Sequence, residues 1–183
     1  MIRTIRTLAL GGAVIAAAVV LSPVAAPAGD ASPSPGIQAA ESSAASSVEV
    51  ISVNSRGTAN NESKDSNRTV YTFPMYSLAT GEEIGTITDD VGLTPVPGVV
   101  DVIATFRFAD GEIVNHMPVS ISQDSQKPGW IVVGNRPEGN TISKATGAYE
   151  GRTGKVRLSG VDDVNRFPAT IFQDDFWIIE LDR

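Results

Sequence analysis

His116 is the only histidine in this 183-residue chain. Its side chain could exchange protons near neutral pH, because an unperturbed imidazole titrates there. It alternates with Asn115 and Met117 in an extended segment, and its neighbours in sequence identify no catalytic partner. A role in binding or in acid–base chemistry therefore stands beside the alternative of an ordinary surface histidine. Ser120 lacks a Gly-x-Ser-x-Gly turn, which argues against hydrolase chemistry.

Arg107 is a second candidate, as a catalytic group or polar anchor in an apolar cavity. It lies between Phe106 and Phe108, whose side chains must point the other way if the segment is a strand. If these phenylalanines fill the interior, Arg107 lies outside. If they pack outward, Arg107 enters a low-dielectric space and needs a carboxylate there. We predict that four residues approach one cavity, with the outward alternative for Arg107 left open: Glu49, Tyr76, Arg107 and Trp130.

Metal chemistry finds little support in the composition. The chain has no cysteine and one histidine, which excludes the usual zinc and thiolate sites. No Asp-x-Asp-x-Asp-Gly spacing of a calcium loop occurs. We therefore expect no metal site.

The first 28 residues have the pattern of a secretory signal peptide: Arg3 and Arg6, then the apolar run 8–21, then Ala26-Pro27-Ala28. An uncleaved N-terminal anchor is the alternative. Residues 29–47 are rich in Ala, Ser and Pro and predict a flexible linker. Loss of residues 1–28 changes the net charge from −7 to −9, because this segment carries two arginines and no acid. An acidic protein of this kind argues against nucleic acid or an anionic membrane surface as partner.

Residues 48–183 predict a single all-β domain. Short β-rich segments recur between turns such as Asp110-Gly111, and no amphipathic helix is evident. We expect a loop over most of 135–149, a turn over 162–165 and a bulge at 174–175. Eight or nine evenly spaced strands favour a closed barrel or a sandwich. The expected strands are 48–53, 69–77, 82–90, 99–108, 112–122, 130–133, 152–161, 167–173 and 176–181.

A glycine-rich stretch leads into the strand 152–161. It resembles the signature of the allene oxide cyclase and dirigent superfamily at five positions: Thr146, Gly147, Tyr149, Gly151 and Gly154. The blocks 71–86 and 105–113 are similar to two hairpins of the same superfamily. The chain departs from the pattern at Lys144 and Ala145, where glycines are usual, and at Thr153.

This resemblance implies one eight-stranded antiparallel β-barrel over 48–183. It implies that the barrel binds a small apolar molecule and steers its cyclisation or coupling with no metal or cofactor, through a cavity carboxylate for which Glu49 is the candidate. The sequence leaves open a non-catalytic carrier, or a secreted interaction protein with a filled barrel. It also leaves the oligomeric state open, although members of the superfamily often form dimers or trimers.

The signal-peptide pattern yields a direct prediction. We expect the mature protein to begin near Gly29 and to be recovered outside the cytoplasmic membrane without a stable anchor. Intact-mass measurement of culture supernatant checks this expectation, and recovery of only the full-length, membrane-bound chain would contradict it.

Overall fold

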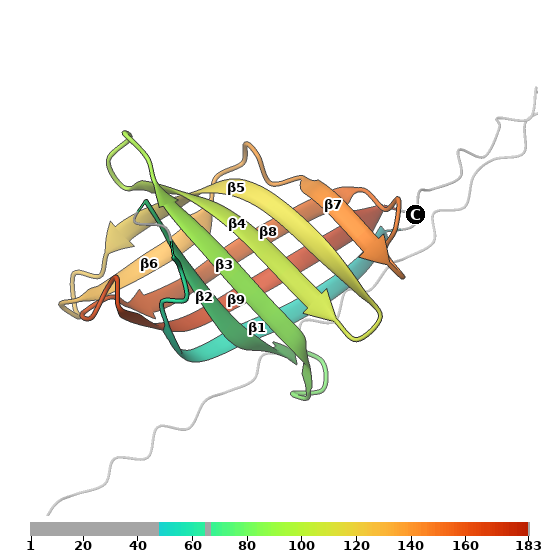
Figure 1. Cartoon of the computed structure of the whole chain (residues 1–183), viewed down its shortest axis with the longest axis horizontal. Coiled ribbons are helices and arrows are strands. Elements are labelled where there is room, and N and C mark those ends of the chain that lie inside the picture. The colour runs from blue at the N-terminus through green and yellow to red at the C-terminus, as the bar shows by residue number, and fades with distance from the viewer. Residues whose placement is uncertain (1–47, 65–66, 183) are drawn as a thin grey trace, which may run out of the picture. The chain divides into compact units, whose positions relative to one another are not determined.

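The computed structural model describes residues 48–64 and 67–182, in which nine antiparallel strands form one sheet. The predicted signal peptide and linker lie outside these residues. Eight strands close into a barrel in the order β1-β2-β3-β4-β5-β6-β8-β9, and β9 pairs with β1 (Figure 1). The strands are β1 (Val48–Asn60), β2 (Arg68–Ser77), β3 (Glu83–Leu93), β4 (Val99–Phe108), β5 (Gly111–Gln123), β6 (Trp130–Asn135), β7 (Ile142–Gly147), β8 (Gly154–Asp163) and β9 (Thr170–Asp182).

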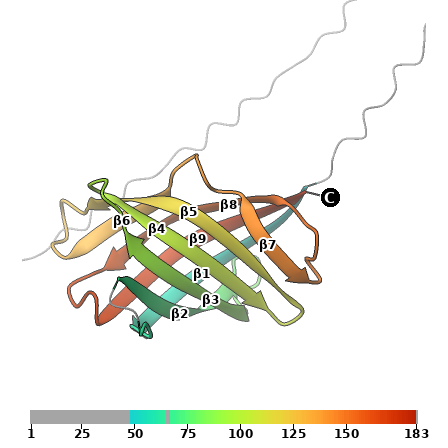
Figure 2. The same cartoon turned by 45° about the horizontal axis from the view of Figure 1, so that its top comes forward.

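The extra strand, β7, completes the pairing of the long strand β5. The C-terminal part of β5 pairs with β6, and its N-terminal part pairs with β7 from Gly111↔Gly147 onward. Figure 2 shows β6 and β7 at opposite ends of β5. This arrangement leaves little of β5 as an open edge, which would otherwise be free to pair with another chain. No helix long and apolar enough to cross a membrane occurs in the described part of the chain.

The inside of the barrel is filled at one end only. Successive side chains of a strand point to opposite faces, so β4 directs Val102, Ala104 and Phe106 inward. The ring of Phe106 packs edge-on against Trp177, with the ring centroids 5.2 Å apart. Toward the barrel end that carries the Asp110-Gly111 turn, the core continues with fully buried side chains such as Met75 and Ile179.

Three local predictions are wrong. Residues 142–147 form β7 rather than loop, because the free side of β5 offers backbone partners even to a segment without clear alternation. Asp174 and Asp175 form no bulge: β9 pairs with β1 without a shift along its whole length. The β8 strand also extends to Asp163, beyond the predicted start of the turn.

The glycine-rich stretch forms a shaped turn, as predicted. Gly147 and Gly151 have φ angles of 64° and 74°, in the left-handed region that side chains disfavour. The ring of Tyr149 packs on Phe108 at a centroid distance of 5.3 Å and so anchors the turn. A β-carbon at Gly147 would overlap the carbonyl oxygen of Asp110, whereas one at Gly151 would meet open space.

These two glycines give a graded prediction. Gly151→Ala should lower the free energy of unfolding by about 1 kcal/mol, the cost of a left-handed residue. Gly147→Ala should cost more, because the backbone of the Asp110-Gly111 turn must also move. Urea unfolding of both variants checks the order, and an equal or reversed cost would contradict the packing at Gly147.

Candidate ligand-binding cavity

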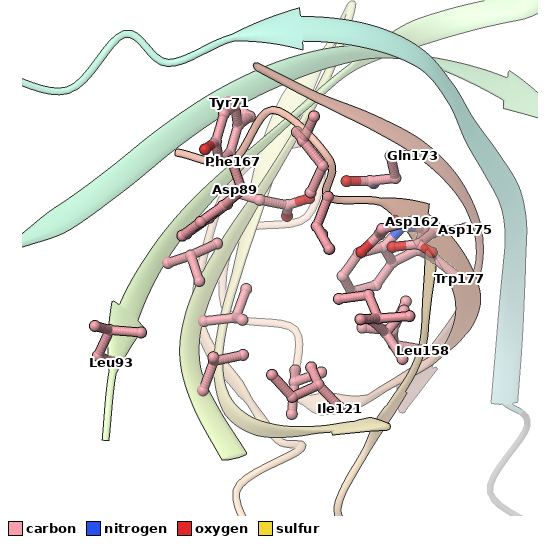
Figure 3. A pocket seen from close by; sticks show the side chains of 18 residues that line it. Tyr71, Asp89, Leu93, Ile121, Leu158, Asp162, Phe167, Gln173, Asp175 and Trp177 are labelled. Carbon is pink, nitrogen blue, oxygen red and sulfur yellow. The ribbon is translucent and has the colours of Figure 1, made fainter. Parts of the chain in front are cut away.

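The half of the barrel away from the glycine-rich turn is hollow. A cavity of about 310 Å³ lies where β3 ends, β4 begins, β5 ends and β9 begins (Figure 3). Leu93 and Phe167 line it and are 80% and 42% exposed, so its mouth lies at this end. The remaining lining residues are Tyr71, Asp89, Val91, Val100, Val102, Val119, Ile121, Ile131, Val133, Leu158, Asp162, Val164, Ile171, Gln173, Asp175 and Trp177.

Three carboxyl groups face this otherwise apolar space. Asp89 comes from β3, Asp162 from β8 and Asp175 from β9, and their residues are 5%, 6% and 3% exposed. Figure 3 shows Asp162 and Asp175 together near Trp177, with Asp89 on another wall. The Oδ1 atom of each carboxyl is buried and has no hydrogen-bond partner among the described residues.

Burial raises the pKa of all three carboxyls, because a charged group loses its hydration there. The pKa of Asp89 rises to about 7, with a hydrogen bond from Gln173 opposing part of the effect. The pKa of Asp162 also rises to about 7, through burial and then through the charge of Asp89. The pKa of Asp175 lies well above its usual value, through burial and then the charges of Asp162 and Asp89. Asp89 and Asp162 therefore exchange protons near neutral pH, and Asp175 keeps its proton above the usual range of an aspartate.

Neighbouring residues fix the cluster in place. Ser55, fully buried on β1, accepts hydrogen bonds from Gln173 Nε2 at 2.6 Å and from Trp177 Nε1 at 3.0 Å. These bonds orient the two β9 side chains that flank Asp175. Gly160 pairs with Asp175 across β8 and β9, and a β-carbon there would overlap the Asp175 carboxyl. A glycine at 160 therefore makes room for the acid.

A hydrogen bond from Tyr71 also stabilises the rim of the cavity. The Tyr71 hydroxyl donates a hydrogen bond to the carbonyl oxygen of Pro168 at 2.8 Å, which ties β2 to the turn between β8 and β9. The rings of Tyr71 and Phe167 lie 6.5 Å apart. Aromatic surface therefore borders one side of the mouth.

The prediction that Arg107 enters the cavity is wrong. Phe106 is buried in the barrel interior, so Arg107 points outward, and its side chain is 49% exposed. The guanidinium donates a hydrogen bond to Thr88 Oγ1 at 2.7 Å and forms an ion pair with Glu112 at 3.2 Å. Interior positions on β4 are taken by apolar side chains, which leaves the charged residue to the solvent side.

The other candidates do not line the cavity either. Glu49 lies at the opposite end of the barrel, where it forms an ion pair with Arg152 at 3.4 Å. Tyr76 alternates with the inward-facing Met75, so it takes the outer face of β2. The prediction that these residues approach one cavity is therefore wrong. A catalytic role of Glu49 or Arg107 stays a prediction that the structure does not test.

Trp130 and His116 lie on the outside of the barrel. Trp130 packs against the outward-facing Phe172, with a centroid distance of 5.8 Å, and the ammonium of Lys127 lies over its ring. His116 is exposed, and its Nε2 lies 2.6 Å from Asp101 Oδ1, while Asp101 Oδ2 accepts a hydrogen bond from Arg68. Neither residue reaches the cavity.

Comparison with known proteins adds little. No family model matches the sequence, and no curated protein is significantly similar to it. Among solved structures, a pyocyanin demethylase aligns with a TM-score of 0.37 and 15% identity, over 74% of this chain and 99% of that one. A similarity of this size carries no argument about function. Membership of the allene oxide cyclase superfamily stays a prediction.

Within the described residues, no three histidine, cysteine or acidic side chains are placed to hold a metal ion. The carboxyl cluster offers protons and negative charge. A protonated carboxyl can donate a hydrogen bond or a proton, and an ionised one can pair with a cation.

The raised pKa values predict a pH-dependent effect of Asp162→Asn. The folded state holds a proton on Asp162 up to about pH 7, whereas the unfolded state loses it near pH 3.8. The Asp162 carboxyl should therefore cost stability as pH rises between these values, and the neutral amide removes that cost. Asp89 and Asp175 remain in both proteins. Relative to wild type, the variant should gain on the order of 2 kcal/mol between pH 5 and pH 8.

Urea unfolding at the two pH values measures this gain. Asp163→Asn is the matched control, since Asp163 is adjacent and faces outward, and hydrogen bonds from Asn165 lower its pKa. The control should show no gain at pH 8. An equal effect of Asp162→Asn at both pH values would contradict the assigned protonation.

Proposed function

We propose that this barrel binds one small, largely apolar molecule in the cavity. The observation that carries the proposal is a hollow of about 310 Å³ in a barrel whose other half is tightly filled. Small-molecule sites usually begin near this volume and combine apolar walls with a few polar groups. A secreted interaction protein with a filled barrel accords less well with this hollow.

The apolar wall supports the same proposal. Strands β4, β5 and β6 contribute only aliphatic side chains to the cavity, among them Val102, Val119 and Val133. Branched side chains of this kind offer dispersion contacts and no hydrogen bonds, so they select for hydrocarbon or aromatic surface. The predicted signal peptide adds the expectation that binding takes place outside the cytoplasm.

A second candidate function is catalysis on the bound molecule. A carboxyl that keeps its proton near pH 7 in an apolar site can act as a general acid in a cyclisation or isomerisation. The raised pKa of Asp89 favours this candidate. The molecule that co-purifies with protein from its own host, returned to ligand-free protein, would separate the two functions. A product of unchanged mass would identify catalysis, and recovery of only the starting molecule would identify a carrier.

Binding can be tested with the neutral dye N-phenyl-1-naphthylamine. We expect its fluorescence to rise on addition of the protein and to saturate at one dye per chain, because the dye brightens in a dry apolar site. Trp177 lines the cavity, so its emission should be quenched by energy transfer to the dye, and Trp130→Phe leaves Trp177 as the only tryptophan.

A matched pair of variants locates the bound dye. Val133→Phe fills the cavity and should weaken dye binding by about tenfold or more, with thermal melting to verify folding. Val132→Phe adds the same volume to the outer face of β6, where Val132 is exposed, and should leave binding unchanged. Equal affinity of both variants would place the dye outside the cavity.

A further inference from the structure

We propose that the natural ligand carries a cationic nitrogen, such as an ammonium group, which docks against the carboxyls of Asp89, Asp162 and Asp175 while its apolar body lies on the β4–β5–β6 wall. This inference rests on the proposed function, because it assumes that the cavity is a binding site. It adds the chemical class of the ligand.

The strands distribute charge in a way that leaves the interior acids without a counter-charge. Each cavity acid belongs to an Asp-Asp pair, and the outward member of each pair has its own partner. Asp90 pairs with Arg68, Asp174 with Arg56, and Asp163 with the amide of Asn165. Two of these exterior acids are thus paired with an arginine, and the third accepts hydrogen bonds from Asn165.

The interior acids have no such compensation. Among the described residues, no lysine, arginine or histidine lines the cavity, and one oxygen of each of the three carboxyls lacks a hydrogen-bond partner. The titratable groups facing this space are Tyr71 from β2, Asp89 from β3, Asp162 from β8 and Asp175 from β9. A buried charge is stable only when it is paired, so these acids hold their protons in the free protein and can ionise when a ligand supplies the cation.

The two sides of the cavity match an amphiphilic cation. The carboxyls lie on β3, β8 and β9, and those of Asp162 and Asp175 lie near the ring of Trp177, whose face can also attract a cation. The opposite wall is aliphatic. An anionic ligand would meet like charge, and a purely apolar ligand would leave the carboxyl oxygens unpaired.

Binding of a cation should also release protons. The free cluster holds protons near neutral pH, because burial and mutual repulsion raise the pKa of its carboxyls. A bound ammonium group stabilises the ionised forms and lowers their pKa. The affinity for an amine should therefore rise between pH 6 and pH 8, while the amine itself stays protonated.

Three matched probes test the class of ligand by titration calorimetry at pH 7.5: 4-phenylbutylamine, 4-phenylbutan-1-ol and 4-phenylbutanoate. They share one apolar body and differ in the terminal group. We expect the amine to bind about tenfold or more tightly than the alcohol, and the carboxylate to show no binding. Amine binding in two buffers of different ionisation enthalpy should reveal proton release.

The variants separate the carboxyl cluster from general surface charge. Asp162→Asn should weaken amine binding by about tenfold and change alcohol binding much less. The control Asp163→Asn removes the same charge from the adjacent, outward position and should change neither. Both variants are compared at pH 6, where the wild-type cluster is largely protonated, and their amine affinities should converge there.

The outcomes distinguish this inference from the proposed function. An alcohol that binds as tightly as the amine would overturn the cationic ligand and leave an apolar-ligand barrel standing. Equal losses of amine binding in Asp162→Asn and Asp163→Asn would also overturn it. If none of the three probes and no neutral dye binds, the proposed function itself fails.

Discussion

Strand β9 holds the barrel together, because it pairs with β1 on one side and with β8 on the other. The pairing with β1 runs from Val48↔Asp182 to Asn60↔Thr170 without a shift. Since side chains alternate along a strand, this register alone decides which residues of β9 face inward. A slip by one residue would exchange Asp175 for Asp174 and turn Trp177 out of the core. The cavity and its polar cluster thus depend on one uninterrupted ladder of backbone hydrogen bonds.

One half of the barrel provides stability, and the other half provides the cavity. The half near the glycine-rich turn is filled by buried side chains such as Met75, Ile113 and Ile179 and supplies most of the apolar burial. The other half contains an open cavity with three buried acids. The cavity and the buried acids each lower the stability of the fold. Such local sacrifices of stability are typical of binding and catalytic sites. The apolar burial in the filled half offsets the stability that the hollow half loses.

Much of the fold could be predicted from the sequence. Alternating β-branched residues and the Asp110-Gly111 turn gave most strands, and Gly147 and Gly151 do adopt the left-handed backbone expected of them. The strand β7 cannot be predicted from its own residues because they do not alternate, and only the free side of β5 makes it a strand. Pairing between distant segments is tertiary information that local pattern does not carry.

The candidate site was predicted less well than the fold. The residue types of familiar chemistry indicate His116 and Arg107, and both side chains are exposed. Two aspartates in succession are common at turns and bulges, so the pattern favours a turn at Asp162 and a bulge at Asp175. Asp89 lies within the predicted strand 82–90, where nothing local marks it as a cavity residue. The alternation held the signal: Asp175 stands two residues from both Gln173 and Trp177, and Asp89 two residues from both Ile87 and Val91. An acid at an inward position of an apolar strand is the feature that predicts a polar group in the cavity.

The mouth of the cavity opens at the barrel end opposite the start of β1 and the finish of β9. Val48 and Asp182 pair with each other at the closed end. Ile171, which lines the cavity, pairs with Ala59 at the other end of the same two strands. Attachment of the domain through either of these ends, to a solid support or to another polypeptide, would direct the opening toward the surrounding medium. Diffusing molecules would then have unobstructed access, and the same polarity would suit an immobilised sensor built from this barrel.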